Sequence, residues 1–119
     1  MINMKLRKNR YLIFRVICKE DNPNITFKDI LNSILNSILT LFGIAGSSKM
    51  YISLMRYYPE KKIGILRCDH LNVTKARAAL VFINNINGYN VILSIAKVTG
   101  TLRKAEKIIN SSSTTKLWE

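Results

Sequence analysis

The sequence is poor in the residues that metal sites and covalent catalysis require. Among its 119 residues are two cysteines, Cys18 and Cys68, and a single histidine, His70. No CxxC spacing occurs, which argues against a zinc site. Cys68 and His70 resemble a nucleophile pair, but residues i and i+2 of a strand share a face without a third group to orient the histidine. We expect core cysteines, a loop histidine and a reducing intracellular setting.

Acidic residues are scarce as well. Seven Asp and Glu stand against nineteen Lys and Arg, for a formal net charge of +12 at pH 7. The chain shows no paired carboxylates at a useful spacing, no GxxxxGK phosphate loop and no catalytic triad. We therefore expect no catalytic residue, and neither a metal nor a cofactor bound by the protein itself. The excess of cations favours an anionic partner, either nucleic acid or an acidic membrane face.

Long uncharged apolar runs are absent too. No stretch of about 18 apolar residues is free of polar side chains, so we expect no membrane-spanning segment. Basic residues precede an apolar run at the N-terminus, as in a signal peptide, but Arg15 interrupts that run after four residues. We expect a cytoplasmic protein that does not bind a membrane.

Hydrophobic periodicity predicts seven elements in the order β-α-β-β-α-β-α. Short runs rich in β-branched and aromatic residues predict strands, and i, i+3, i+4 spacing predicts helices. The expected strands are 10–18, 50–58, 63–68 and 89–98, and the expected helices are 27–42, 73–86 and 102–110.

Capping residues define where these helices begin and end. Thr26 with Asp29 forms a capping box, and Gly43 ends the first helix before a flexible loop over 43–49. Asn72 is expected to cap the second helix, and Asn87-Gly88 to end it.

The third helix follows the sequence "VTGTLRKAEKII". Gly100 is expected to permit a tight turn from strand to helix, and Thr99 or Thr101 to cap the helix. Arg103 and Lys104 lie in its first turn, where the helix dipole disfavours cations unless an anion binds there.

This order of elements predicts an α+β, ferredoxin-like (RRM-like) β-α-β-β-α-β sandwich. Two helices would cover one face of a four-stranded antiparallel sheet. The additional C-terminal helix, through Leu102, Ala105 and Ile109, would cover part of the other face. We divide the chain into a basic N-terminal arm (1–9), one sandwich domain (10–110) and a flexible tail (111–119).

Base stacking on the sheet is poorly supported, because neither face of the strand 63–68 carries an aromatic residue. Phosphate contacts fit better, because cations gather in the N-terminal arm, at a turn and at helix starts. Each single cation is equally well explained as a solvated charge. The candidate RNA-binding residues are Lys5, Arg7, Lys8, Arg10, Lys61, Lys62, Lys75, Arg77, Thr101, Arg103 and Lys104.

Three blocks of sequence resemble the archaeal ribonuclease P protein component 2 family, whose eukaryotic relatives belong to ribonuclease P and MRP. The blocks are "KNRYLIFRV", "FGIAGSSKMYISLMRYYPEKKIGILRC" and "VTGTLRKAEKII", in that order between Lys8 and Ile109. Matching positions by motif are Arg10, Tyr11, Arg56, Tyr57, Arg67, Gly100, Thr101 and Arg103.

The resemblance implies a noncatalytic subunit of ribonuclease P, an enzyme that removes the 5′ leader of precursor tRNA. In this family the RNA subunit does the chemistry, and Mg²⁺ is expected to act there. The implied partners are the ribonuclease P RNA, precursor tRNA within the assembly, and the barrel-fold protein component 3, with a possible dimer of heterodimers. Candidate partner-binding residues are Tyr11, Arg15, Arg56, Tyr57 and Arg67.

Two alternatives remain open. Arg15 and Arg67 fit a partner-facing role and a half-buried ion pair equally well. For the whole chain, the alternative function is a stand-alone RNA-binding module, such as a small ribosomal or single-strand RNA-binding protein. A ligand-sensing domain of the same fold is disfavoured by the charge of +12.

Overall fold

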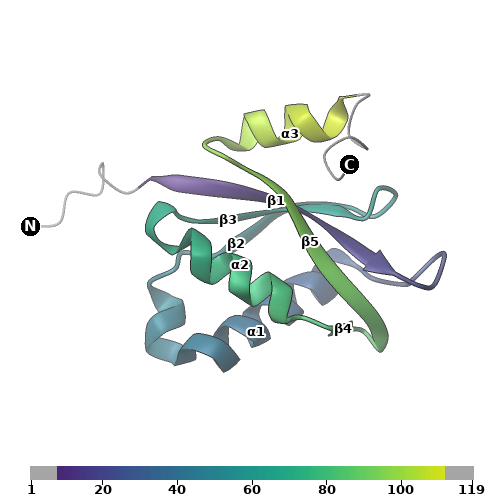
Figure 1. Cartoon of the computed structure of the whole chain (residues 1–119), viewed down its shortest axis with the longest axis horizontal. Helices are drawn as coiled ribbons and strands as arrows, with labels where there is room; N and C mark the ends of the chain where they lie inside the picture. The colour runs from purple at the N-terminus through teal and green to yellow at the C-terminus, as the bar shows by residue number, and fades with distance from the viewer. Residues whose placement is uncertain (1–7, 112–119) are drawn as a thin grey trace, which may run out of the picture.

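A five-stranded antiparallel sheet lies between two layers of helix in the computed structural model, which describes residues 8–111. Helices α1 and α2 cover one face of the sheet, and α3 crosses the other (Figure 1). The strand order is β2-β3-β1-β5-β4. The elements are β1 (Asn9–Cys18), α1 (Phe27–Ser48), β2 (Ser53–Tyr58), β3 (Ile63–Asp69), α2 (Val73–Phe82), β4 (Asn85–Ile86), β5 (Tyr89–Thr99) and α3 (Leu102–Asn110).

The predicted ferredoxin-like sandwich with an added C-terminal helix is confirmed, but the sheet has five strands rather than four. The difference lies at Asn87-Gly88, which we expected to end a helix. Both residues have positive φ, 53° and 87°, and they form the turn of a β4–β5 hairpin. An Asn-Gly pair favours such a turn because both positions tolerate left-handed backbone. Helix α2 therefore ends at Phe82, four residues earlier than predicted.

The first helix begins as its sequence predicts. Thr26 accepts a hydrogen bond from the backbone N–H of Asp29, and the Asp29 carboxylate accepts one from the N–H of Thr26, which completes the capping box. Gly43 interrupts the regular helix with φ 72°. Helical turns then resume and reach Ser48, so the expected loop over 43–49 is wrong for most of its length.

Two hydrophobic layers hold the sandwich together. On the α1 and α2 side, alternate residues of β1, among them Leu12, Phe14 and Val16, pack with the buried residues of both helices. On the α3 side, Ile13 of β1 packs with a smaller cluster that includes Ile109 of α3. Because side chains alternate along a strand, β1 contributes to both layers and is the central strand of the fold.

Helix α1 is long and apolar enough to cross a membrane by length and composition, with a mean hydropathy of 1.5, and it is the one such helix among residues 8–111. Core helices of soluble proteins meet the same criterion. Here Ile30, Ile34 and Ile38 are buried against the sheet, and the Ser37 hydroxyl donates a hydrogen bond to the Ala79 carbonyl of α2 at 2.7 Å. These contacts support a core-packing role for α1.

Phe14 and Gly64 are directly opposite one another on β1 and β3. A Cβ atom at Gly64 would lie 2.5 Å from Cζ of Phe14, whose ring occupies the space above the glycine. Gly100, by contrast, has no positive φ, and a Cβ atom there would have no neighbour within 4 Å. The turn before α3 therefore does not depend on the conformational freedom of glycine that we expected Gly100 to supply.

These two glycines provide a matched test of the core. Gly64→Ala should lower the free energy of unfolding by about 1–3 kcal/mol, because the Phe14 ring must move. Gly100→Ala should change it by less than about 0.5 kcal/mol. Urea denaturation measures both, and equal losses in the two variants would contradict this packing.

Candidate nucleic-acid interface

Helix α3 is docked on the sheet through one apolar side. Ala105 and Ile109 are fully buried against Ile13, Ile63 and Ile65, which come from β1 and β3. The helix therefore covers the β1–β3 part of this face, and Ile92 and Lys97 of β5 are exposed. The predicted cover by Leu102, Ala105 and Ile109 is confirmed.

Two polar contacts fix the flank of α3 that faces β2. Nε of Arg56 lies 3.1 Å from Oε2 of Glu106, an ion pair between β2 and the helix. Nζ of Lys61, on the β2–β3 hairpin, donates a hydrogen bond to the Ile109 carbonyl at 3.1 Å. A cation at a helix C-terminus stabilises the exposed carbonyls there. On this flank each cation is thus matched by a carboxylate or a carbonyl.

The opposite flank of α3 forms a groove with β5. Its volume is about 680 Å³. Among the described residues that line it, four are cations and none is acidic. The groove is lined by Lys97, Thr101, Arg103, Lys104, Lys107, Ile108 and Ser111.

A β-bulge directs Lys97 into this groove. The pairing of β1 with β5 shifts by one residue, so that Phe14 is opposite Ile95 but Ile13 is opposite Lys97. The extra residue is Ala96. Without it, Lys97 would follow Ile95 onto the α1 and α2 face. The sequence shows no glycine or proline at this point, and so no local signal identified Lys97 as a site residue.

A second bulge acts in the same way on β2. Leu54 is opposite Leu66, whereas Arg56 is opposite Ile65, which makes Met55 the extra residue. The shift places Arg56 on the α3 face, where it meets Glu106. Two irregularities in the sheet therefore each bring a cation to the face that α3 covers.

The start of α3 has the geometry expected from its sequence. Oγ1 of Thr101 accepts a hydrogen bond from the Lys104 backbone N–H at 3.1 Å, so Thr101 is the N-cap. Thr99 is buried instead, and its hydroxyl donates to the Thr101 carbonyl at 2.9 Å. The first turn contains no acid to offset Arg103 and Lys104. Positive charge is thus concentrated where the helix dipole is also positive.

Most carboxylates of residues 8–111 have local structural roles elsewhere. Asp29 caps α1, Asp69 is buried, Glu20 accepts a hydrogen bond from the Cys18 thiol at 2.8 Å, and Glu106 pairs with Arg56. None of these lines the groove. The groove's positive charge is therefore not neutralised by acids that line it.

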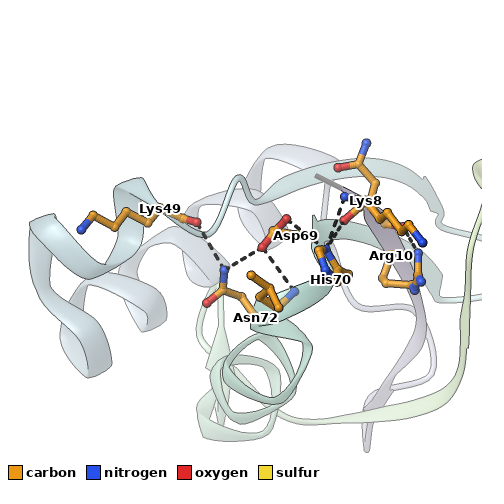
Figure 2. Close-up of polar contacts among 8 residues, drawn as sticks. Lys8, Arg10, Lys49, Asp69, His70 and Asn72 are labelled. Carbon is orange, nitrogen blue, oxygen red and sulfur yellow. Dashed lines mark hydrogen bonds and ion pairs between the residues drawn. The ribbon is translucent and has the colours of Figure 1, made fainter. Parts of the chain in front are cut away.

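Lys8 and Arg10 lie at another part of the sheet. The backbone N–H of His70 donates to the Lys8 carbonyl at 2.7 Å, and Nη1 of Arg10 donates to the Asn9 carbonyl at 2.8 Å. Figure 2 shows this end of β1 beside Asp69, whose carboxylate accepts a hydrogen bond from the side chain of Asn72 at 3.4 Å. Lys5 and Arg7 lie outside the described residues, as does most of the tail 111–119.

The remaining candidate RNA-binding cations are dispersed. Nζ of Lys62 donates to the Asp21 carbonyl at 3.1 Å, and Nζ of Lys75 lies 5.8 Å from the centre of the Phe42 ring. Arg77 is exposed on α2. None of the three lines the groove, so the structure gathers only Thr101, Arg103 and Lys104 from the predicted set and adds Lys97 and Lys107.

The candidate partner-binding residues do not form one surface. Tyr11, Arg15 and Arg67 are half-buried on the sheet face that carries α3. Tyr57 packs against the opposite hydrophobic layer, and Arg56 is in the ion pair with Glu106. Arg67 forms no ion pair with another residue in the described range, and its Nε is buried without a hydrogen-bond partner there.

The two cysteines belong to different environments. Cys68 is fully buried, and burial raises the pKa of its thiol to about 11. The hydrogen bond to Glu20 raises the pKa of the Cys18 thiol. A raised pKa reduces the thiolate fraction at neutral pH, so neither thiol is activated as a nucleophile.

Comparison with known proteins connects this architecture to a family. The sequence model of the Rpp14/Pop5 family matches residues 10–110. The chain belongs to the Rpp14/Pop5 family. The resemblance carried by the three sequence blocks is confirmed by this match.

Relatives in both archaea and yeast are similar over most of their length. Ribonuclease P protein component 2 of Pyrococcus horikoshii is 31% identical over 100 residues, which cover 84% of this chain and 81% of the relative. The ribonuclease P/MRP protein subunit POP5 of Schizosaccharomyces pombe is 37% identical over 112 residues, with coverage of 83% and 81%.

A solved structure shows the same fold. A chain of the cryo-EM structure of yeast ribonuclease MRP superposes with a TM-score of 0.70 at 15% sequence identity. The match covers 98% of this chain and 88% of that one.

The Thr101 cap provides a test of how the groove wall is held. Thr101→Ala should lower the free energy of unfolding by about 1 kcal/mol, because the Lys104 N–H loses its acceptor. Thr101→Ser keeps the hydroxyl and should differ from the wild type by a few tenths of a kcal/mol at most. Urea denaturation distinguishes them, and an unchanged stability in Thr101→Ala would contradict the cap.

Proposed function

We propose that this family member is a noncatalytic protein subunit of the ribonuclease P ribonucleoprotein, and that it binds and stabilises the RNA that removes the 5′ leader of precursor tRNA. The observation that carries the proposal is the groove between α3 and β5, which residues 8–111 line with four cations and no acid. The names of the relatives support the same assignment.

The protein's contribution would be electrostatic. Folded RNA brings phosphates close together, and a protein that contacts them replaces condensed counterions and stabilises the compact form. Helix α3 presents its cations on a rigid element, because Ala105 and Ile109 are buried beneath it. The backbone that carries these cations is therefore already ordered before phosphate binds, and only their side chains lose conformational freedom on binding.

Mg²⁺ would act at the RNA. Among residues 8–111, no three His, Cys, Asp or Glu side chains are grouped so that they could hold a metal ion. Asp69 and His70 are adjacent, with 3.5 Å between Oδ1 and Nδ1, but no third ligand joins them. The described residues therefore do not fit a catalytic metal, and we derive no chemical step from this chain.

The surface that we assign to a protein partner is separate from the groove between α3 and β5. A groove of about 320 Å³ beside α1 is lined by Leu35, Ile38, Leu39, Ser47, Ser48, Tyr51 and Ile52, and it contains no charged residue. It belongs to the face of the sheet opposite α3 (Figure 1). This separation supports simultaneous contact with RNA on one side and with the barrel-fold component 3 on the other. A dimer of such heterodimers is part of the same proposal.

We place this assembly in the cytoplasm, and two observations support that location. Both cysteines are unpaired, as is usual in a reducing compartment. The apolar helix α1, whose two charged residues are Lys28 and Asp29 in its first turn, packs into the core of the protein through Ile30, Ile34 and Ile38.

The assignment is tested by capturing the tagged protein from native extract of its source cells. We expect recovery of a structured RNA, a barrel-fold protein and an activity that cleaves precursor tRNA at its 5′ end. Nuclease digestion of the RNA should abolish that activity.

Two results would contradict the proposal. Recovery with ribosomes alone would favour the stand-alone RNA-binding module. Cleavage of precursor tRNA by the purified protein without RNA would show that the chain is itself catalytic.

A further inference from the structure

The cations of residues 8–111 differ in what their side chains contact. Arg56, Lys61 and Lys62 each bind a carboxylate or a carbonyl of this chain, at 3.1 Å in every case. These three hold the hairpin and α3 in place. Their donors are already satisfied in part, so they are poorly suited to bind a further ligand.

The four cations of the groove are different. Lys97, Arg103, Lys104 and Lys107 are exposed, and their side chains make no hydrogen bond or ion pair with any described residue. Like charges held on one helix and the neighbouring strand repel one another. An anion in the groove would relieve that repulsion, whereas a neutral ligand would not.

The other lining groups limit which part of an RNA could bind. Ser111 donates its hydroxyl hydrogen bond to the Ile108 carbonyl at 2.9 Å, and Thr101 Oγ1 accepts from the Lys104 N–H. Among residues 8–111, the lining contains no Asn, Gln, Asp or Glu, which are the side chains that read adenine and cytosine edges. Arg and Lys can read guanine edges, so guanine has to be included in the test. The described lining contains no aromatic ring on which a base could stack.

We propose that the groove between α3 and β5 binds the sugar–phosphate backbone of RNA independently of sequence, and that Lys97 and Lys107 are phosphate contacts together with Arg103 and Lys104. The inference rests on the proposed function, because it takes RNA as the polyanion. It goes further in assigning backbone rather than base recognition to this groove, and in adding two residues from outside the predicted set.

The bulge at Ala96 is what makes this arrangement possible. It places Lys97 opposite Ile13, on the same face as α3, instead of on the face packed against α1 and α2. The groove then has a cation on its sheet side as well as on its helix side. An RNA backbone that lies in the groove is contacted from two directions. This constrains its path more than a row of lysines on one helix would.

The first test measures the salt dependence of binding to a 20-nucleotide oligo(U) RNA by the full chain. The slope of log K against log salt is negative, and in the Lys97→Gln/Lys107→Gln double variant its magnitude should decrease by about 1.4. Each lost phosphate contact of a single strand removes about 0.7. Neither lysine is buried or hydrogen-bonded, so circular dichroism and thermal unfolding should be unchanged.

The matched control is the double variant Lys28→Gln/Lys49→Gln. It removes the same charge from two exposed lysines at either end of α1, on the other side of the sheet. In this control the magnitude of the salt slope should decrease by less than about 0.3. Equal slopes in the two double variants would overturn the assignment of the groove.

The second test separates backbone from base recognition. Oligo(U), oligo(C), oligo(A) and a guanine-containing GU-repeat RNA should bind within about fivefold of one another, and an oligonucleotide with an uncharged methylphosphonate backbone should lose binding. A preference above tenfold for one base that disappears in Lys97→Gln/Lys107→Gln would overturn the proposal. So would groove-dependent binding to phosphatidylserine vesicles without binding to RNA.

These outcomes are distinguishable from failure of the proposed function. If the captured assembly processes precursor tRNA but the two double variants have the same salt slope, the subunit assignment stands and the groove assignment falls. If oligonucleotides bind in the groove but no ribonuclease P activity is captured, the groove assignment stands and the subunit assignment falls.

Discussion

The packing of α3 across β1 and β3 is the constraint on which the rest of the site depends. Burial of Ala105 and Ile109 against Ile13 and Ile65 determines how far the helix lies from β5. Burying one isoleucine side chain contributes on the order of 2 kcal/mol, whereas an exposed ion pair such as Arg56–Glu106 contributes about 1 kcal/mol or less. The apolar contact therefore supplies most of the docking energy, and the polar contacts on the β2 flank orient the helix. The groove is the space that remains on the other flank.

The grooves on the two sides of the sheet differ in charge. The chain has few acids, and most of those among residues 8–111 have structural roles: Asp29 caps α1, Asp69 is buried and Glu106 pairs with Arg56. None of these three lines the groove between α3 and β5. The uncharged groove beside α1 belongs to the opposite face. Under the proposed function, RNA would bind in the cationic groove and a protein partner in the uncharged one, so the two would not compete for one surface. The partial burial of Arg67 has no explanation among the contacts of residues 8–111.

The sequence predicted the elements whose signals are local. The Thr26–Asp29 capping box and a strand over 10–18 follow from residue type and spacing, and both are confirmed, with the strand beginning one residue earlier at Asn9. Of the two expected caps of α3, Thr99 and Thr101, the structure has Thr101. Several errors come from features that depend on pairing between distant segments, whereas those at Gly43 and Gly100 are local. Asn87-Gly88 fits a helix end or a hairpin turn equally well until β4 pairs with β5, and Gly43 does not show that helical turns resume after it. Lys97 was missed because strict alternation along β5 assigns it to the core face, and only the register shift opposite Ile13 reveals its true side.

The sequence also could not predict that Lys61, Lys62 and Lys75 make separate contacts within the protein. Their partners are distant in sequence: Ile109, Asp21 and Phe42 respectively.

Lysine acylation with and without the captured RNA tests the central claim most directly, because it reports on each lysine of the intact assembly separately. Mass spectrometry should show protection of Lys97, Lys104 and Lys107 when RNA is bound, and their reactivity should return after nuclease digestion. Lys28 and Lys49, on the α1 side, should not respond to nuclease. Nuclease-sensitive protection of Lys28 and Lys49, with the groove lysines reactive throughout, would contradict the account.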